Sequence, residues 1–148
     1  MGGITDVKLT PLRIIDTEGG DVYHAIKSGD AGYCGFGEAY FSTVQQGFVK
    51  TWKRHRLMTL NLVVISGAIR FVIHDDRPGS PSFGCMEEFR IGPPEAYCRL
   101  TIPPGLWMAF QGVGPAISIL LNVTDLAHDP LEADRVGLDK ISYDWETQ

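Results

Sequence analysis

The chain has 148 residues, of which 44% are hydrophobic and 21% charged, and its 13 basic and 18 acidic residues give a net charge of −5. This length predicts one domain over residues 1–148 with a buried hydrophobic core. The acidic balance excludes a nucleic-acid surface built on many phosphate contacts, and the absence of any run of 18 apolar residues excludes a membrane-spanning helix.

Seventeen Gly and nine Pro residues divide the chain into short segments, a pattern typical of β-rich folds. In chain order, the predicted strands cover residues 6–15, 21–27, 38–44, 47–55, 60–66, 68–74, 86–91, 96–102, 106–111 and 116–123. Residues 29–37 carry four glycines and form either a mobile lid or a plain surface loop. The polar tail from residue 124 is expected to hold a short helical turn near residues 130–135.

The strand pattern indicates the fold class. No 3.6-residue apolar stripe runs for three turns, whereas residues 60–66 are almost all apolar, as in a strand buried on both faces. Many strands in a small domain leave a sandwich or a closed barrel, because both protect the sheet edges. We predict an all-β jelly-roll barrel with a core at about 38–125, N-terminal strands at 6–27 and a tail at 126–148.

The cysteines and the N-terminus bear on the compartment. Cys34, Cys85 and Cys98 are odd in number, widely spaced and without a CxxC pair, which argues against a disulfide scaffold or a cysteine zinc site. The first ten residues lack the apolar stretch of a secretory signal. We therefore expect a cytoplasmic protein.

The most unusual segment is residues 50–56, KTWKRHR, where five of seven residues are basic or His in an acidic protein. Side chains of a strand alternate between its faces, so Lys53 and His55 share one face and Trp52 lies on the other. Two interpretations remain open. Lys53 and His55 meet an anionic ligand inside a barrel, or the segment is a solvated edge strand whose charges deter aggregation.

Two stretches resemble the two cupin motifs, whose two His, Glu and final His bind a metal. The first runs from Gly47 to Gly67, and the second is residues 103–108, PPGLWM. Of the four expected ligands the chain keeps only His55. The other positions carry Lys53, Leu60 and Met108. Because a divalent site needs three or more converging nitrogen or oxygen ligands, we expect no metal.

Within the cupins, the closer resemblance is to the nucleotide-sugar epimerases, the family of dTDP-4-dehydrorhamnose 3,5-epimerase. The segments that carry it span about residues 11–145 and are 49–55 (VKTWKRH), 58–61 (MTLN), 66–67 (SG), 75–84 (DDRPGSPSFG), 102–105 (IPPG), 123–125 (VTD), 128–130 (HDP) and 144–145 (DW). The resemblance implies a homodimer that acts on a nucleotide-sugar or another small molecule. Together with the missing metal ligands, the acidic charge and the absence of a long apolar run, it leads us to expect no cofactor and no nucleic-acid or membrane partner.

In that family a His removes the proton next to the 4-keto group and a Tyr delivers one to the opposite face. The resemblance places Lys53 and Leu121 at these positions, and Met108 where a further His lies around the substrate, so the usual acid–base set is missing. Candidate catalytic residues are Lys53 as base, nucleophile or ion partner, His55 as base, and Tyr40 as acid. Each residue could instead have no catalytic role: Lys53 as a charged residue at the barrel mouth, His55 as a core or rim histidine, and Tyr40 as a packing residue. Met108 is expected to line the substrate site.

The same resemblance suggests further substrate-binding residues. Lys50 takes the place of an Arg that contacts the nucleotide diphosphate, and a basic residue is kept there. Arg77 lies in a turn, where a structural ion pair with Asp75 is the alternative. His24 is a candidate phosphate contact, in its own subunit or across a dimer. Asn122, near the end of the last core strand, is a candidate sugar contact.

Three functions therefore remain open at the level of the sequence. The first is a metal-independent epimerase or isomerase of a nucleotide-linked keto-sugar, in polysaccharide or glycosylated-metabolite biosynthesis. The second is a catalytically diverged cupin that binds a ligand or partner without epimerase activity. The third is another natural-product reaction on an apolar substrate, for which the expected lining is Leu60, Met108, Phe110 and Leu121.

Overall fold

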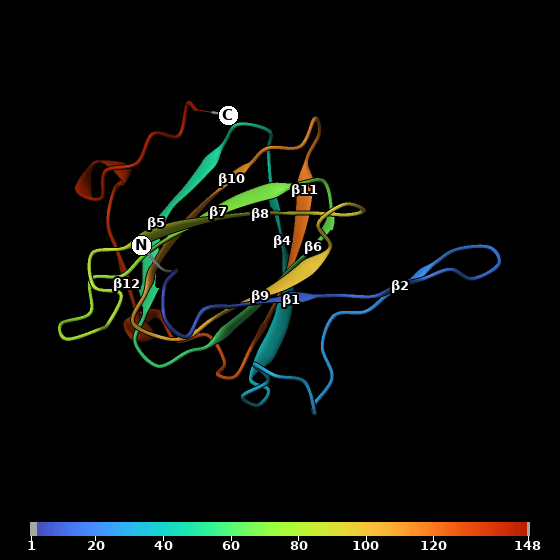
Figure 1. Cartoon of the computed structure of the whole chain (residues 1–148), viewed down its shortest axis with the longest axis horizontal. Helices are drawn as coiled ribbons and strands as arrows, with labels where there is room; N and C mark the ends of the chain where they lie inside the picture. Colours follow the sequence, from blue (N-terminus) through green and yellow to red (C-terminus); the bar gives the residue numbers. More distant parts are fainter. Residues whose placement is uncertain (1–2, 148) are drawn as a thin grey trace.

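The computed structural model describes residues 3–147, whose strands form two five-stranded antiparallel sheets and a separate hairpin (Figure 1). Across the first sheet the order is β1 (Lys8–Pro11), β9 (Cys98–Ile102), β6 (Leu60–Ser66), β11 (Ser118–Thr124) and β4 (Glu38–Val44). Across the second it is β12 (Ala133–Arg135), β5 (Val49–His55), β10 (Trp107–Gly112), β7 (Ile69–His74) and β8 (Met86–Ile91). The hairpin of β2 (Ile14–Ile15) and β3 (Val22–Tyr23) projects away from the sheets.

This architecture confirms the predicted all-β jelly roll. Strands β4, β6 and β8 begin and end at the predicted residues. The strand expected at 21–27 is shorter, because the chain beyond β3 turns to other partners: the Tyr97 hydroxyl donates to the His24 carbonyl and Arg99 donates to the Ala25 carbonyl. The tail forms the expected turn as a 3₁₀ helix, η1 (Pro130–Glu132), but continues into β12, which the polar sequence did not indicate.

The main hydrophobic core lies between the two sheets. Its largest contributors come from the central strands of each sheet and include Leu62, Val64, Phe71, Ile73 and Leu100. Alternation of side chains along β11 sends Leu120 and Asn122 to the inside and Leu121 to the outside. The same alternation fixes which side chains reach the cavity at the open end of the barrel.

A second, smaller core lies on the outer face of the second sheet. Trp52 is fully buried there beside Trp107, and the C-terminal tail covers both through Tyr143 and Trp145. The Trp52 and Trp145 rings are 6.0 Å apart. Arg70 donates a hydrogen bond of 2.8 Å to the Trp145 carbonyl, which fastens the tail to the sheet. Trp52 therefore anchors β5 from behind while Lys53 faces inward, as the alternation predicted.

The glycine-rich segment 29–37 is held along the first sheet. Arg99 donates to the Ala31 carbonyl at 2.9 Å, and Asn61 donates to the Gly32 carbonyl at 3.0 Å. Gly32 has a positive φ of 91°, and a Cβ there would approach the Thr101 hydroxyl to 2.7 Å. The segment is thus a pinned surface loop rather than a lid. None of the helices within residues 3–147 has the length and apolar character needed to cross a membrane.

Substitution of the anchor tests this arrangement. Trp52→Ala should lower the free energy of unfolding by about 4 kcal/mol, because it leaves a large cavity beneath the tail. Trp145→Ala, at the half-buried outer layer of the same cluster, should lower it by less than half as much. Urea unfolding of both variants measures the difference, and equal losses would contradict the assignment of Trp52 as the inner anchor.

Candidate functional site

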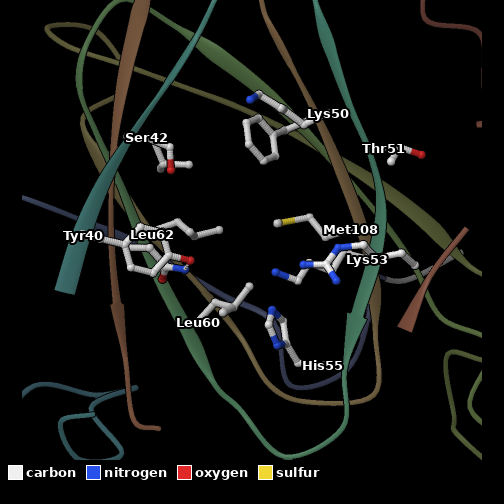
Figure 2. A pocket seen from close by; sticks show the side chains of 13 residues that line it. Tyr40, Ser42, Lys50, Thr51, Lys53, His55, Leu60, Leu62 and Met108 are labelled. Atoms are coloured by element: carbon white, nitrogen blue, oxygen red, sulfur yellow. Dashed lines mark hydrogen bonds between the residues drawn. The ribbon is translucent and has the colours of Figure 1, made fainter. Parts of the chain in front are cut away.

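A cavity of about 390 Å³ opens between the two sheets (Figure 2). Its apolar side consists of Leu60, Leu62, Met108, Phe110 and Leu120. Its polar side chains include three cations, one imidazole and one phenol: Lys50, Lys53, Arg135, His55 and Tyr40. A cavity lined by apolar surface with a few converging polar groups is the usual form of a small-molecule site.

Six of the eight predicted site residues line this cavity. They are Tyr40, Lys50, Lys53, His55, Met108 and Asn122. Figure 2 shows Lys53 and His55 entering from one side and Tyr40 from the opposite side. The structure thus brings together residues that are far apart in the sequence.

An irregularity in β5 explains why Lys50 shares the cavity with Lys53. Lys53 lies opposite Met108 and Lys50 opposite Phe110, so β5 has one residue more than β10 between the two pairs. Such a bulge changes the alternation of side chains. Lys50 enters the cavity near its exposed mouth, while the Thr51 hydroxyl, at the rim, donates to the Val136 carbonyl at 2.7 Å.

His55 is held by a residue that the sequence analysis did not single out. Its Nδ1 lies 2.6 Å from Oε1 of Glu132, the last residue of η1. The other carboxylate oxygen of Glu132 accepts hydrogen bonds of 2.9 Å from the backbone N–H groups of Leu57 and Met58. Glu132 lies 77 residues from His55, and only its place beside a predicted turn hinted at a role.

The environment of this pair defines its ionisation. Burial is the largest influence on the pKa of His55 and lowers it, the hydrogen bond and charge of Glu132 raise it, and the charges of Lys53 and Arg135 lower it, so that the pKa lies below its ordinary value. Burial by itself raises the pKa of Glu132, but the hydrogen bonds from His55, Leu57 and Met58 outweigh it and bring the value to about 2. At neutral pH the pair is therefore a carboxylate and a neutral imidazole. We assign the His55 proton to Nδ1, facing Glu132, which leaves the Nε2 lone pair free to accept a proton.

Tyr40 occupies the opposite wall. The Asn122 amide donates to the Tyr40 oxygen at 3.0 Å, and the two residues face each other across β4 and β11. This contact orients the phenol and leaves its O–H to donate to a ligand. The family resemblance assigned Leu121 to the position of the family's Tyr. Leu121 lies between Leu120 and Asn122 on β11, and because these two neighbours point into the barrel, Leu121 points out of it. The expected placement of Leu121 in the lining is therefore wrong.

Arg77 and His24 do not reach the cavity within this chain. The Arg77 guanidinium donates two hydrogen bonds of 2.9 Å to the buried Asp75, whose carboxylate also accepts from Ser80 and Ser82. These contacts support the structural alternative for Arg77, and they hold the pKa of Asp75 well below its usual range despite its burial. His24 lies beside Arg99 on the outside of the first sheet.

Arg135 is the other cavity residue that the sequence analysis missed. It belongs to β12, where it lies opposite Lys53 of β5. A three-residue strand in a polar tail gives too little periodicity to be recognised. Within residues 3–147, no three His, Cys, Asp or Glu side chains are grouped so that they could hold a metal ion.

Comparison with known proteins identifies similar folds and sequences. No protein-family model matches the chain. The structure of a dTDP sugar isomerase from Desulfovibrio desulfuricans superposes with a TM-score of 0.93 and 37% identity, covering 96% of this chain and 92% of that one. NovW, a 4-keto-6-deoxy sugar epimerase from Streptomyces spheroides, has the same fold, with a TM-score of 0.85 and 20% identity over 99% of this chain and 78% of its own.

A curated relative has a related description. A probable low-salt glycan biosynthesis epimerase from Haloferax volcanii is 29% identical over 146 residues, which cover 97% of this chain and 91% of the relative. The similarity therefore extends over almost the whole of both chains.

The pairing of His55 with Glu132 can be tested by titration. Glu132→Gln keeps an oxygen that accepts from Nδ1–H but removes the negative charge, so the pKa of His55 should fall further below its ordinary value. NMR titration of the imidazole protons measures this change. The wild-type protein, measured under the same conditions, is the control. An unchanged or raised pKa for His55 would contradict the assigned pair.

Proposed function

The chain belongs to the family of RmlC-like dTDP-sugar epimerases and isomerases, and we propose that it is an enzyme that removes a proton next to the carbonyl of a nucleotide-linked keto-sugar without a metal ion or other cofactor. The observation that carries the proposal is the neutral imidazole of His55, fixed by Glu132 at the wall of a cavity that also presents cations and a phenol. A positioned base with a depressed pKa is suited to proton abstraction near neutral pH.

His55 is the general base of the proposed reaction. Its Nε2 takes the proton from the carbon next to the carbonyl, and the charge of Glu132 stabilises the imidazolium that forms. The hydrogen bond to Oε1 keeps the ring in one orientation and one tautomer. His55 takes over the task that the family gives to another His, from a position two residues further along β5.

Tyr40 is the general acid on the other side of the sugar ring. Tyr40 belongs to the first sheet and His55 to the second, so a ring bound between the sheets meets them from opposite sides. A proton that leaves to His55 and one that arrives from Tyr40 together invert the carbon. Asn122 acts through Tyr40, because its amide holds the phenol oxygen.

Lys50 is the proposed contact for the nucleotide diphosphate. It is exposed near the mouth of the cavity, whereas His55 is buried, so the charged nucleotide remains outside and the sugar enters. The descriptions of the relatives support a dTDP-linked sugar as substrate and glycan biosynthesis as the process. A homodimer remains a prediction from the family resemblance.

Exchange with solvent deuterium tests the base. In D₂O, NMR of a panel of dTDP-4-keto-sugars should show deuterium entering at the carbon next to the carbonyl, and His55→Gln should slow this exchange by about 100-fold or more. If the wild-type protein exchanges no proton of any member of the panel, even at high concentration, the catalytically diverged cupin becomes the better account.

A second variant tests the acid separately. Tyr40→Phe should retain exchange, because His55 can return deuterium to the face it came from, but should abolish formation of the inverted sugar. Product configuration is read from the ring coupling constants in the same spectra. Tyr33→Phe, in the pinned loop outside the cavity, is the matched control. Inversion by Tyr40→Phe at the wild-type rate would exclude this phenol as the acid.

A further inference from the structure

We propose that Lys53 and Arg135 together form an oxyanion site, which binds the carbonyl oxygen of the sugar as it gains negative charge. This inference rests on the proposed function and adds to it a catalytic residue, Arg135, from the short strand β12. The two residues supply the stabilisation of the intermediate, while His55 and Tyr40 move the protons.

The register of the strands places the two cations side by side. Arg135 of β12 lies directly opposite Lys53 of β5, and both side chains line the cavity. Residues opposite one another in an antiparallel pair have Cβ atoms roughly 5 Å apart, and like charges there destabilise the sheet. Another facing pair of like charges, Arg70 and Arg90, lies between β7 and β8; Lys53 and Arg135 differ from it because both of their side chains line the cavity.

The neighbouring carboxylates are engaged elsewhere. Glu132 is bound to His55, and Asp134 is bound to Arg54 and Arg56 on the outer side of the sheet. Within residues 3–147, neither Lys53 nor Arg135 has a carboxylate oxygen within 4 Å. Burial lowers the pKa of Lys53, the charge of Arg135 lowers it further, and the charge of Glu132 offsets part of this shift. An anion entering the cavity would relieve the repulsion between the two cations.

The position of the pair favours the sugar oxygen over the diphosphate. Lys53 precedes His55 by two residues on the same strand, a rise of roughly 7 Å. In the proposed complex, the carbonyl lies at Lys53 and the adjacent C–H group at His55. Figure 2 shows Lys53 between Lys50 and His55 along the cavity wall. From the mouth to the interior, Lys50, Lys53 and His55 thus follow the same order as the nucleotide, the carbonyl and the acidic carbon of the proposed substrate.

The charge balance of the step explains why such a site accelerates it. When Nε2 of His55 takes the proton, the C–H electron pair forms a carbon–carbon double bond, and the carbonyl π pair moves to oxygen. The ketone is neutral before this step and the enolate oxygen is negative after it. Donors and cations at that oxygen therefore stabilise the intermediate more than the bound substrate. Reprotonation of carbon returns the electrons and restores the ketone.

Variants of the two cations separate this role from phosphate binding. Lys53→Met and Arg135→Met should each slow deuterium exchange at saturating substrate by about 100-fold. The affinity for dTDP alone, measured by calorimetry, should change by less than about threefold, because dTDP lacks the sugar. Lys53→Arg should restore part of the rate. Arg90→Met, which removes an exposed cation from β8, is the matched control and should match the wild type.

Thermal unfolding distinguishes a lost function from a lost fold. Because each Met variant removes one of two facing like charges, neither should lower the midpoint of unfolding. A fall in dTDP affinity of tenfold or more with exchange at saturation unchanged would assign the pair to the diphosphate and overturn the inference. Wild-type exchange rates and wild-type dTDP affinity in both Met variants would also overturn it. If the wild type itself exchanges no proton, the proposed function fails first, and this inference fails with it.

Discussion

The carboxylate of Glu132 is the constraint on which the rest of the site depends. A buried charge is costly unless it is paired and hydrogen-bonded, and this one satisfies both oxygens with His55 Nδ1 and the backbone N–H groups of Leu57 and Met58. These contacts join the end of β5, the loop that follows it and the turn η1 at one point. The C-terminal tail is thereby held against the barrel at the residue proposed as the base.

After Glu132 the tail continues as β12, which pairs with β5. Side chains of β12 alternate between the two faces of the sheet, so its charged residues are divided between them. Asp134 points outward and binds Arg54 and Arg56, and Asp76 also lies 3.4 Å from Arg54, so two carboxylates face the two outer cations of the basic segment. Arg135 points inward and joins Lys53 in the cavity. The cluster of basic residues in an acidic protein therefore has two explanations. Its outer members, Arg54 and Arg56, stabilise the strand pair, and its inner members, Lys50, Lys53 and His55, face the ligand site.

Much of this fold could be predicted from the sequence because strand alternation is a local property. It placed Lys53 and His55 on one face and Trp52 on the other, and the apolar run of β6 marked a strand buried on both faces. Leu121 was expected in the lining without regard to this alternation, and a difference of one position along β11 exchanges inside for outside. Glu132 and Arg135 lie in a polar tail about 80 residues from their partners, where no periodicity points to the contact.

The proposed function places an acid–base pair at other positions of the barrel than those the family resemblance indicates. That resemblance puts Lys53 and Leu121 at the positions of the family's His and Tyr, whereas the cavity presents an imidazole from the second sheet and a phenol from the first. The cavity of about 390 Å³ is lined by residues of both sheets, so a sugar ring bound there has side chains of both sheets around it. Inversion of a carbon requires groups on both faces of that ring, whereas transfer of a proton along one face requires only the base. In the proposed reaction, the orientation of Tyr40 by Asn122, rather than the identity of the base, is therefore the feature that favours epimerisation over isomerisation.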